Sequence, residues 1–153
     1  MTGARVRIGV IGLGDIAVRA HLPAILREPR ASLVAIAEID PERLARYAPD
    51  GVRTTATPQS VLEDADIDAV IIATPPDVTA SVAVAALEAG KVVLAEKPLA
   101  PTLAETTELS ATPGAADRLQ IGLTYRHRPA VERLRDLIRE GALGSPLLVQ
   151  ASV

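Results

Sequence analysis

Residues 6–17 read VRIGVIGLGDIA, and this stretch decides the fold. Val6 to Ile11 form a run rich in β-branched residues, which is typical of a strand buried on both faces of a parallel sheet. The run ends at Gly12 and Gly14, and a helical pattern follows from Asp15 to about Arg27. A strand, a glycine turn and a helix in this order predict the first unit of an α/β fold.

The glycine turn carries the pattern G-x-G-x-x-A, formed by Gly12, Gly14 and Ala17. Gly12 allows a tight turn, Gly14 lets the backbone approach a pyrophosphate, and Ala17 keeps the helix close to the sheet. The helix start at Asp15 and Ile16 supplies amide donors and partial positive charge. A glycine turn without a ligand is the alternative, but its place between strand and helix favours dinucleotide binding by these five residues.

Strands and helices alternate along the rest of the chain. Proline and capping signals mark helix starts at Asp40-Pro41, Thr57-Pro58 and Thr102 with Glu105. We expect strands at 33–37, 52–55, 69–73, 92–95 and 119–123, and helices after 40, 57 and 102 and at 78–89 and 129–140. This alternation predicts a doubly wound, mostly parallel Rossmann sheet with helices on both faces. We expect residues 1–124 to form this domain, 125–144 a helical connection packed on it, and 145–153 the first strand of a further domain.

Two acids compete for the ribose of a bound dinucleotide. Glu38 ends the second strand about 20 residues beyond the glycines, as a ribose-binding carboxylate should. Helix capping alone explains Asp40, so we assign Glu38 to the ribose. A carboxylate there repels a 2′-phosphate, which predicts NAD rather than NADP, and the nearby Arg43 is the argument for NADP.

The composition excludes several classes of function. The net charge is −3 and no basic block could follow a phosphate backbone, so we expect no nucleic-acid partner. The chain has no cysteine and only two distant histidines, His21 and His127, so we expect no metal site. No apolar run is long enough to span a membrane and no signal peptide is evident, which favours a cytoplasmic protein. The many Ala and Arg residues suit a bacterial source.

Three segments together resemble the glucose-fructose oxidoreductase, inositol dehydrogenase and rhizopine-catabolism family of oxidoreductases. They are GVIGLGDIA at 9–17, ATPPD at 73–77 and GKVVLAEKPLA at 90–100, in the family's order and spacing. YRHRPAVERL and GALG, at 125–134 and 141–144, are also similar to the segment with which the family leaves its Rossmann domain. The resemblance implies hydride transfer between a nicotinamide cofactor and a sugar, cyclitol or related hydroxyl, with a homo-oligomer expected for a full-length form.

The resemblance makes Lys97 of the EKP segment the catalytic candidate, beside the nicotinamide and the substrate hydroxyl. It also places Glu96 and the loop Thr74, Pro75 and Pro76 against the cofactor. Independently, a lysine at the carboxyl end of a Rossmann strand faces the ligand crevice, and its ammonium can exchange a proton when desolvated. A surface ion pair between Lys97 and Glu96 is the alternative.

Other residues have plainer interpretations. We expect Tyr125 and Arg126 to serve packing, and His21 and His127 to lie at the surface rather than to act as catalytic acids. Many family members carry a histidine in place of Thr79, and the family's second domain, which supplies part of the substrate site, does not appear in the sequence. The alternatives to an enzyme portion are a non-catalytic NAD(H)-binding module and an amino-acid dehydrogenase of the same fold, which the EKP segment argues against.

Overall fold

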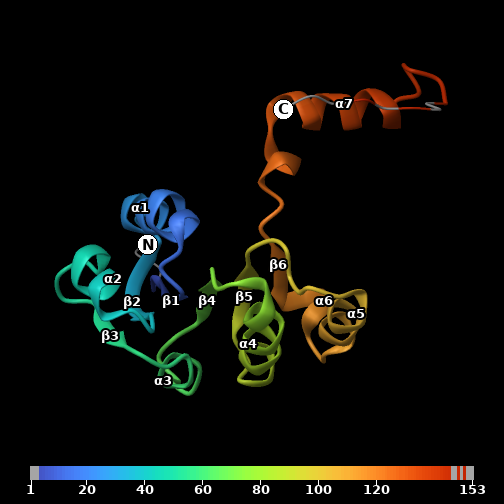
Figure 1. Ribbon diagram of the computed structural model, residues 1–153. Helices are drawn as coiled ribbons and strands as arrows, with labels where there is room; N and C mark the ends of the chain where they lie inside the picture. The colour runs from blue at the N-terminus through green and yellow to red at the C-terminus, as the bar shows by residue number, and fades with distance from the viewer. Residues whose placement is uncertain (1–3, 146–147, 149, 151–153) are drawn as a thin grey trace. The chain divides into compact units, whose positions relative to one another are not determined.

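The computed structural model describes residues 4–145, 148 and 150. These residues fall into two compact units that divide between Gly122 and Leu123. The first unit contains a sheet with its covering helices, and the second contains a 3₁₀ turn and one helix (Figure 1). Each unit is described by itself.

The first unit is built on a six-stranded sheet in which every pairing is parallel. The strands are β1 (Val6–Ile11), β2 (Ala31–Ala37), β3 (Arg53–Thr55), β4 (Ala69–Ile72), β5 (Val92–Ala95) and β6 (Leu119–Ile121). Their order across the sheet is β3-β2-β1-β4-β5-β6, so the direction of winding reverses between β1 and β4. The doubly wound Rossmann sheet predicted from the sequence is therefore confirmed.

Helices cover both faces of this sheet, as predicted (Figure 1). They are η1 (Ala17–His21), α1 (Leu22–Arg27), α2 (Pro41–Tyr47), α3 (Gln59–Leu62), α4 (Pro76–Glu88), α5 (Leu103–Ala111) and α6 (Ala115–Arg118). Neighbouring strand residues point to opposite faces. Thus Ile11 packs with α3, α4 and α5, whereas Val10 packs with α1 and its neighbours. Both faces are apolar because the strands are buried on both sides.

Capping side chains and prolines determine where the helices begin. Two of the predicted helix starts need correction. The Asp40 side chain accepts hydrogen bonds from the first turn of α2, and the Thr102 capping box of α5 is present. The predicted cap at Thr57 is wrong, because α3 begins at Gln59 with no side-chain cap. The helix expected from residue 78 begins instead at Pro76, because proline suits the first helical position.

Two short helical elements were not predicted. The four-residue helix α6 follows Gly114, where we expected only a connection. In addition, Ala17–His21 is a π turn inside the predicted helical stretch 15–27. Such a turn has no local sequence signature, and π turns inside helices occur frequently at functional sites.

Lys91, one of two lysines in the chain, is buried and serves the fold. Its ammonium donates to the carbonyl oxygens of Asp64 and Ile67, at 2.5 and 2.9 Å. These carbonyls belong to the loop between α3 and β4. The side chain thus satisfies the buried Ile67 carbonyl and gives a second donor to the Asp64 carbonyl, which also accepts from the Ile67 amide at 3.1 Å.

The second unit contains the 3₁₀ turn η2 (Thr124–His127) and helix α7 (Pro129–Arg139). The Arg128 guanidinium lies 3.9 Å from the centre of the Tyr125 ring, which fits the packing role expected for Tyr125. Most of the strand expected at 145–153 lies outside the described residues. Among the residues that are described, no helix is long and apolar enough to cross a membrane.

Candidate functional site

The carboxyl ends of β1 and β4 meet where the sheet order reverses, which is where open α/β sheets bind their ligands. A pocket of about 490 Å³ opens there. It is lined by Gly12, Gly14, Glu38, Ile39, Arg43, Pro58, Ala73, Thr74, Pro75, Val78, Ser81 and Val82. Five of the predicted cofactor residues, from three separate loops, thus line one pocket.

The glycine turn brings two loops into direct backbone contact. Gly12 has φ +87°, and a Cβ there would lie 2.6 Å from the Ala73 carbonyl oxygen, so only glycine fits. A Cβ at Gly14 would lie 3.3 Å from the same oxygen. Ala17 is fully buried, and Asp15 and Ile16 stand exposed in the first helical turn. The turn therefore presents bare backbone to the pocket, as close approach of a pyrophosphate requires.

Glu38 and Arg43 hold the peptide groups of Leu13 from both sides. The Glu38 carboxylate accepts from the Leu13 amide at 2.7 Å and from the Asp40 amide at 3.0 Å. The Arg43 guanidinium donates to the Leu13 carbonyl, with Nε at 3.1 Å. Each carboxylate oxygen keeps a free lone-pair site for a ligand hydroxyl. Two of the five Arg43 donors, in contrast, are already used by the turn, a role that sequence reasoning missed.

The loop after β4 is fixed by hydrogen bonds between the buried Thr79 hydroxyl and Thr74, which the sequence did not reveal. Thr79 Oγ1 lies 2.9 Å from the Pro75 carbonyl, 3.0 Å from the Thr74 carbonyl and 2.9 Å from Thr74 Oγ1. The carbonyls only accept, so the single Thr79 hydroxyl hydrogen is shared between them, and the Thr79 oxygen accepts the Thr74 hydrogen. Thr74 lines the pocket, whereas Pro76 stands exposed in the first turn of α4.

Glu96 and Lys97 follow β5 and do not line this pocket. Lys97 is exposed, its peptide bond to Pro98 is cis, and within the described residues it forms no ion pair with Glu96. Glu96 is buried and pairs with His21, whose Nε2 lies 2.8 Å from Glu96 Oε1. The surface role expected for His21 is therefore wrong, because the π turn ends at a side chain that contacts residue 96 across the fold.

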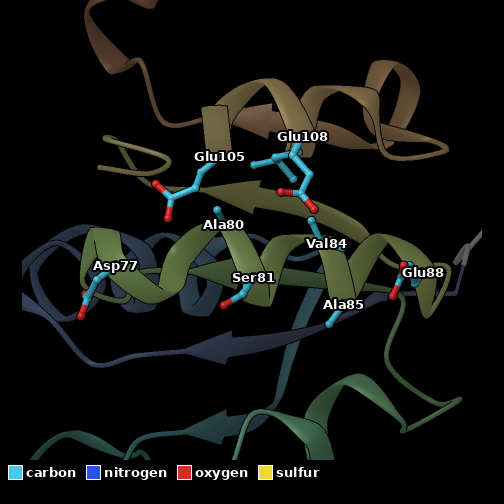
Figure 2. Close-up of a pocket in the computed structure, with 9 residues that line it drawn as sticks. Asp77, Ala80, Ser81, Val84, Ala85, Glu88, Glu105 and Glu108 are labelled. Atoms are coloured by element: carbon cyan, nitrogen blue, oxygen red, sulfur yellow. The ribbon is translucent and has the colours of Figure 1, made fainter. Parts of the chain in front are cut away.

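A second pocket, of about 380 Å³, lies between α4 and α5 (Figure 2). Glu105 and Glu108 of α5 line it together with Asp77 and Glu88 of α4. Local structure explains two of these acids, since Asp77 lies in the first turn of α4 and Glu105 completes the capping box of α5. Among the described residues, no basic side chain lines this pocket, so its charge opposes binding of a dinucleotide phosphate.

Sheet order, glycine turn and strand-end carboxylate together define a Rossmann-fold nucleotide-binding domain. A family model for oxidoreductases with an NAD-binding Rossmann fold matches residues 6–122. The chain belongs to this family, which comprises the relatives of glucose-fructose oxidoreductase and inositol dehydrogenase. The family resemblance stated from the sequence motifs is therefore confirmed.

The names of individual relatives describe enzymes that act on cyclitols and sugars. Inositol 2-dehydrogenase 4 of Saccharopolyspora erythraea is 36% identical over 99% of this chain, and a dTDP-3,4-didehydro-2,6-dideoxy-alpha-D-glucose 3-reductase of Streptomyces antibioticus is 35% identical over 94%. The chain spans 46% and 44% of these relatives.

Two solved structures have a closely similar fold. Scyllo-inositol dehydrogenase from Lactobacillus casei, solved with NAD(H) and scyllo-inositol, has a TM-score of 0.82 at 26% identity. The match covers 92% of this chain and 43% of that one. A 3-ketoreductase from Actinomadura kijaniata, solved with NADP and TDP-benzene, has a TM-score of 0.74 at 35% identity, covering 90% and 43%. Structural relatives therefore include binders of either nicotinamide cofactor.

Proposed function

We propose that this chain is the nucleotide-binding portion of an NAD(P)-dependent oxidoreductase that acts on a sugar, cyclitol or related hydroxyl substrate, with NAD as the preferred cofactor. The observation that carries the proposal is the pocket at the sheet reversal, where Gly12, Gly14 and Glu38 converge. The substrate class rests on the relatives reported above, whose names give inositol and a deoxysugar as substrates.

The pocket fits a dinucleotide in both shape and chemistry. The bare backbone of Gly14, which lines the pocket, suits the pyrophosphate, and the free lone pairs of Glu38 suit ribose hydroxyls. Ile39, 82% exposed beside Glu38, and Val78 offer apolar surface for the flat face of a base. A bound nicotinamide dinucleotide would supply hydride acceptance or donation.

The preference for NAD follows from the negative charge of Glu38 and from the Arg43 donors that already form hydrogen bonds. A 2′-phosphate at the ribose would meet the Glu38 carboxylate, and like charges at short distance repel. Arg43 is the nearest cation on α2, but two of its donors hold the Leu13 carbonyl. Binding a phosphate with Arg43 would thus compete with the bonds that shape the glycine turn.

Lys97 is the proposed catalytic residue. It is exposed at the carboxyl end of β5, two strands away from the glycine turn in the sheet. Because it has no acidic partner among the described residues, its ammonium is available to move a proton at the substrate oxygen. Glu96, the partner considered from the sequence, is occupied by His21 instead.

Calorimetric titration of NADH and NADPH into the 153-residue chain tests whether it binds a nicotinamide cofactor and which one it prefers. We expect NADH to bind more tightly, Gly14→Val to abolish binding, and Glu38→Gln to narrow the preference for NADH. Glu42→Gln, which removes a charge from an exposed residue on α2, is the matched control and should leave the preference unchanged. No binding of either cofactor by the wild-type chain would overturn the proposal.

A separate assay measures turnover as the reduction of NAD with myo-inositol as the probe substrate. We expect Lys97→Met to abolish any turnover without changing NADH affinity. Unchanged turnover would remove Lys97 from the mechanism. Binding of NADH without any turnover would favour the non-catalytic module over an enzyme.

A further inference from the structure

We infer that His21 is a positioning residue for Lys97, because the buried His21–Glu96 pair ties the helix after the glycine turn to the segment that follows β5. Glu96 transmits this restraint, since its carboxylate also holds the Lys97 backbone. The inference rests on the proposed function in one respect, namely that Lys97 faces the substrate.

The pair is buried and closely enclosed. The His21 and Glu96 side chains are only 13% and 9% exposed, and their polar atoms are 2.8 Å apart. A buried carboxylate that loses its donor keeps its full desolvation penalty, so this contact resists opening far more than a surface pair does. On its other side the carboxylate meets the backbone of Gly122, where a Cβ would lie 2.8 Å from both carboxylate oxygens. Glu96 is therefore confined between His21 and the end of β6.

The helix departs from regular geometry in the turn that ends at His21. That turn, Ala17–His21, is a π turn between the glycine motif and α1. A π turn inserts residues relative to an α-helix, so the residues at its end face a different side than a regular helix would give them. Its last residue is the one that reaches Glu96, although the two are 75 positions apart.

Glu96 connects this contact to Lys97. The Glu96 amide donates to the Ile72 carbonyl at 2.9 Å, which continues the sheet one bond beyond β5. Its carboxylate oxygen Oε2 lies 3.3 Å from the Lys97 amide, while Oε1 faces His21. Because the Lys97 side chain is exposed, packing does little to hold it, and this hydrogen bond restrains the backbone from which it extends. Without His21 the carboxylate is free to turn, and the Lys97 amide loses a fixed acceptor.

Selective labelling with ¹⁵N-lysine gives a direct test in the cofactor-free protein. The chain has two lysines, Lys91 and Lys97, so its amide spectrum contains two lysine signals. The buried Lys91 reports on the fold. We compare the hydrogen-exchange rates of the two amides in wild type, His21→Gln and His21→Asn. The glutamine amide reaches about as far as the histidine Nε2, whereas the asparagine amide is one methylene shorter.

We expect His21→Asn to speed exchange at Lys97 roughly tenfold, the factor set by loss of one hydrogen bond to a charged group. His21→Gln should restore the rate to within about twofold of wild type, and Lys91 should be unchanged in both. His21→Leu is the second disrupting variant and should behave as His21→Asn does. An unchanged Lys97 rate in the disrupting variants overturns the inference, and so does equal acceleration at both lysines, since that marks general loosening. Failure of NADH to bind would overturn the proposed function and leave this result standing.

Discussion

Replacing Gly12 by alanine should destabilise the domain far more than the same change at another glycine with the same backbone conformation. Gly12 and Gly51 have φ values of +87° and +79°, so both replacements force alanine into the left-handed region. A Cβ at Gly51 meets nothing within 4 Å, whereas one at Gly12 lies 2.6 Å from the Ala73 oxygen and 2.8 Å from its carbon. Those backbone atoms cannot move freely, because the Ala73 amide bonds to the Ile11 carbonyl at 2.8 Å.

The cost of the left-handed backbone conformation and the cost of steric overlap can be estimated separately. The left-handed conformation costs alanine about 1–2 kcal/mol, offset in part by roughly 0.4–1 kcal/mol from the stiffer unfolded chain. Steric overlap in a packed site adds about 1–3 kcal/mol. Gly51→Ala should therefore lower the unfolding free energy by about 1 kcal/mol and Gly12→Ala by about 3 kcal/mol. Urea unfolding at 25 °C measures both, and a difference below about 0.5 kcal/mol between the variants would refute the argument from close backbone approach.

Three further predictions concern the scaffold. Lys91→Met should lower the unfolding free energy by about 1–3 kcal/mol, because the buried Ile67 carbonyl loses its donor and the Asp64 carbonyl loses one of two, and an unchanged urea midpoint would contradict this. Thr102→Ala should cost about 1 kcal/mol through loss of the capping box at Glu105, measured in the same way. The Arg30 guanidinium, by hydrogen bonding, lowers the pKa of the Glu28 carboxyl from 4.5 to about 2. Glu28 therefore contributes stability that is present above pH 4.5 and lost as the pH falls toward 2, so the Tm difference from Glu28→Gln should disappear over that range, and a constant difference would contradict the assignment.

Much of the fold was predictable because its signals are local. The strands β1, β4 and β5 appear as short apolar runs, and the starts of α2 and α5 appear as capping residues, all within a few positions of one another. The errors were also local. Two of them fell on the short helices α3 and α6, because a helix of four residues has too few positions to show a period. The others were the start of α4, which lies two residues earlier than predicted, and the π turn Ala17–His21.

The site was predictable only in part. Gly12, Gly14 and Glu38 were identified by a motif whose spacing reflects direct contact with one ligand, and they line one pocket. His21 was misjudged, because a histidine on a helix has no local feature that distinguishes a surface position from a buried partner. The role of Thr79 was missed for the same reason.

The sequence by itself determined the order of strands and helices, the glycine turn and the family, because each depends on residues close together along the chain. Only the tertiary structure decided which side chains meet. Glu38 reaches Leu13 across 25 positions, and His21 reaches Glu96 across 75. Such contacts depend on which strands lie side by side, and this order is set by packing of the whole sheet rather than by any local pattern.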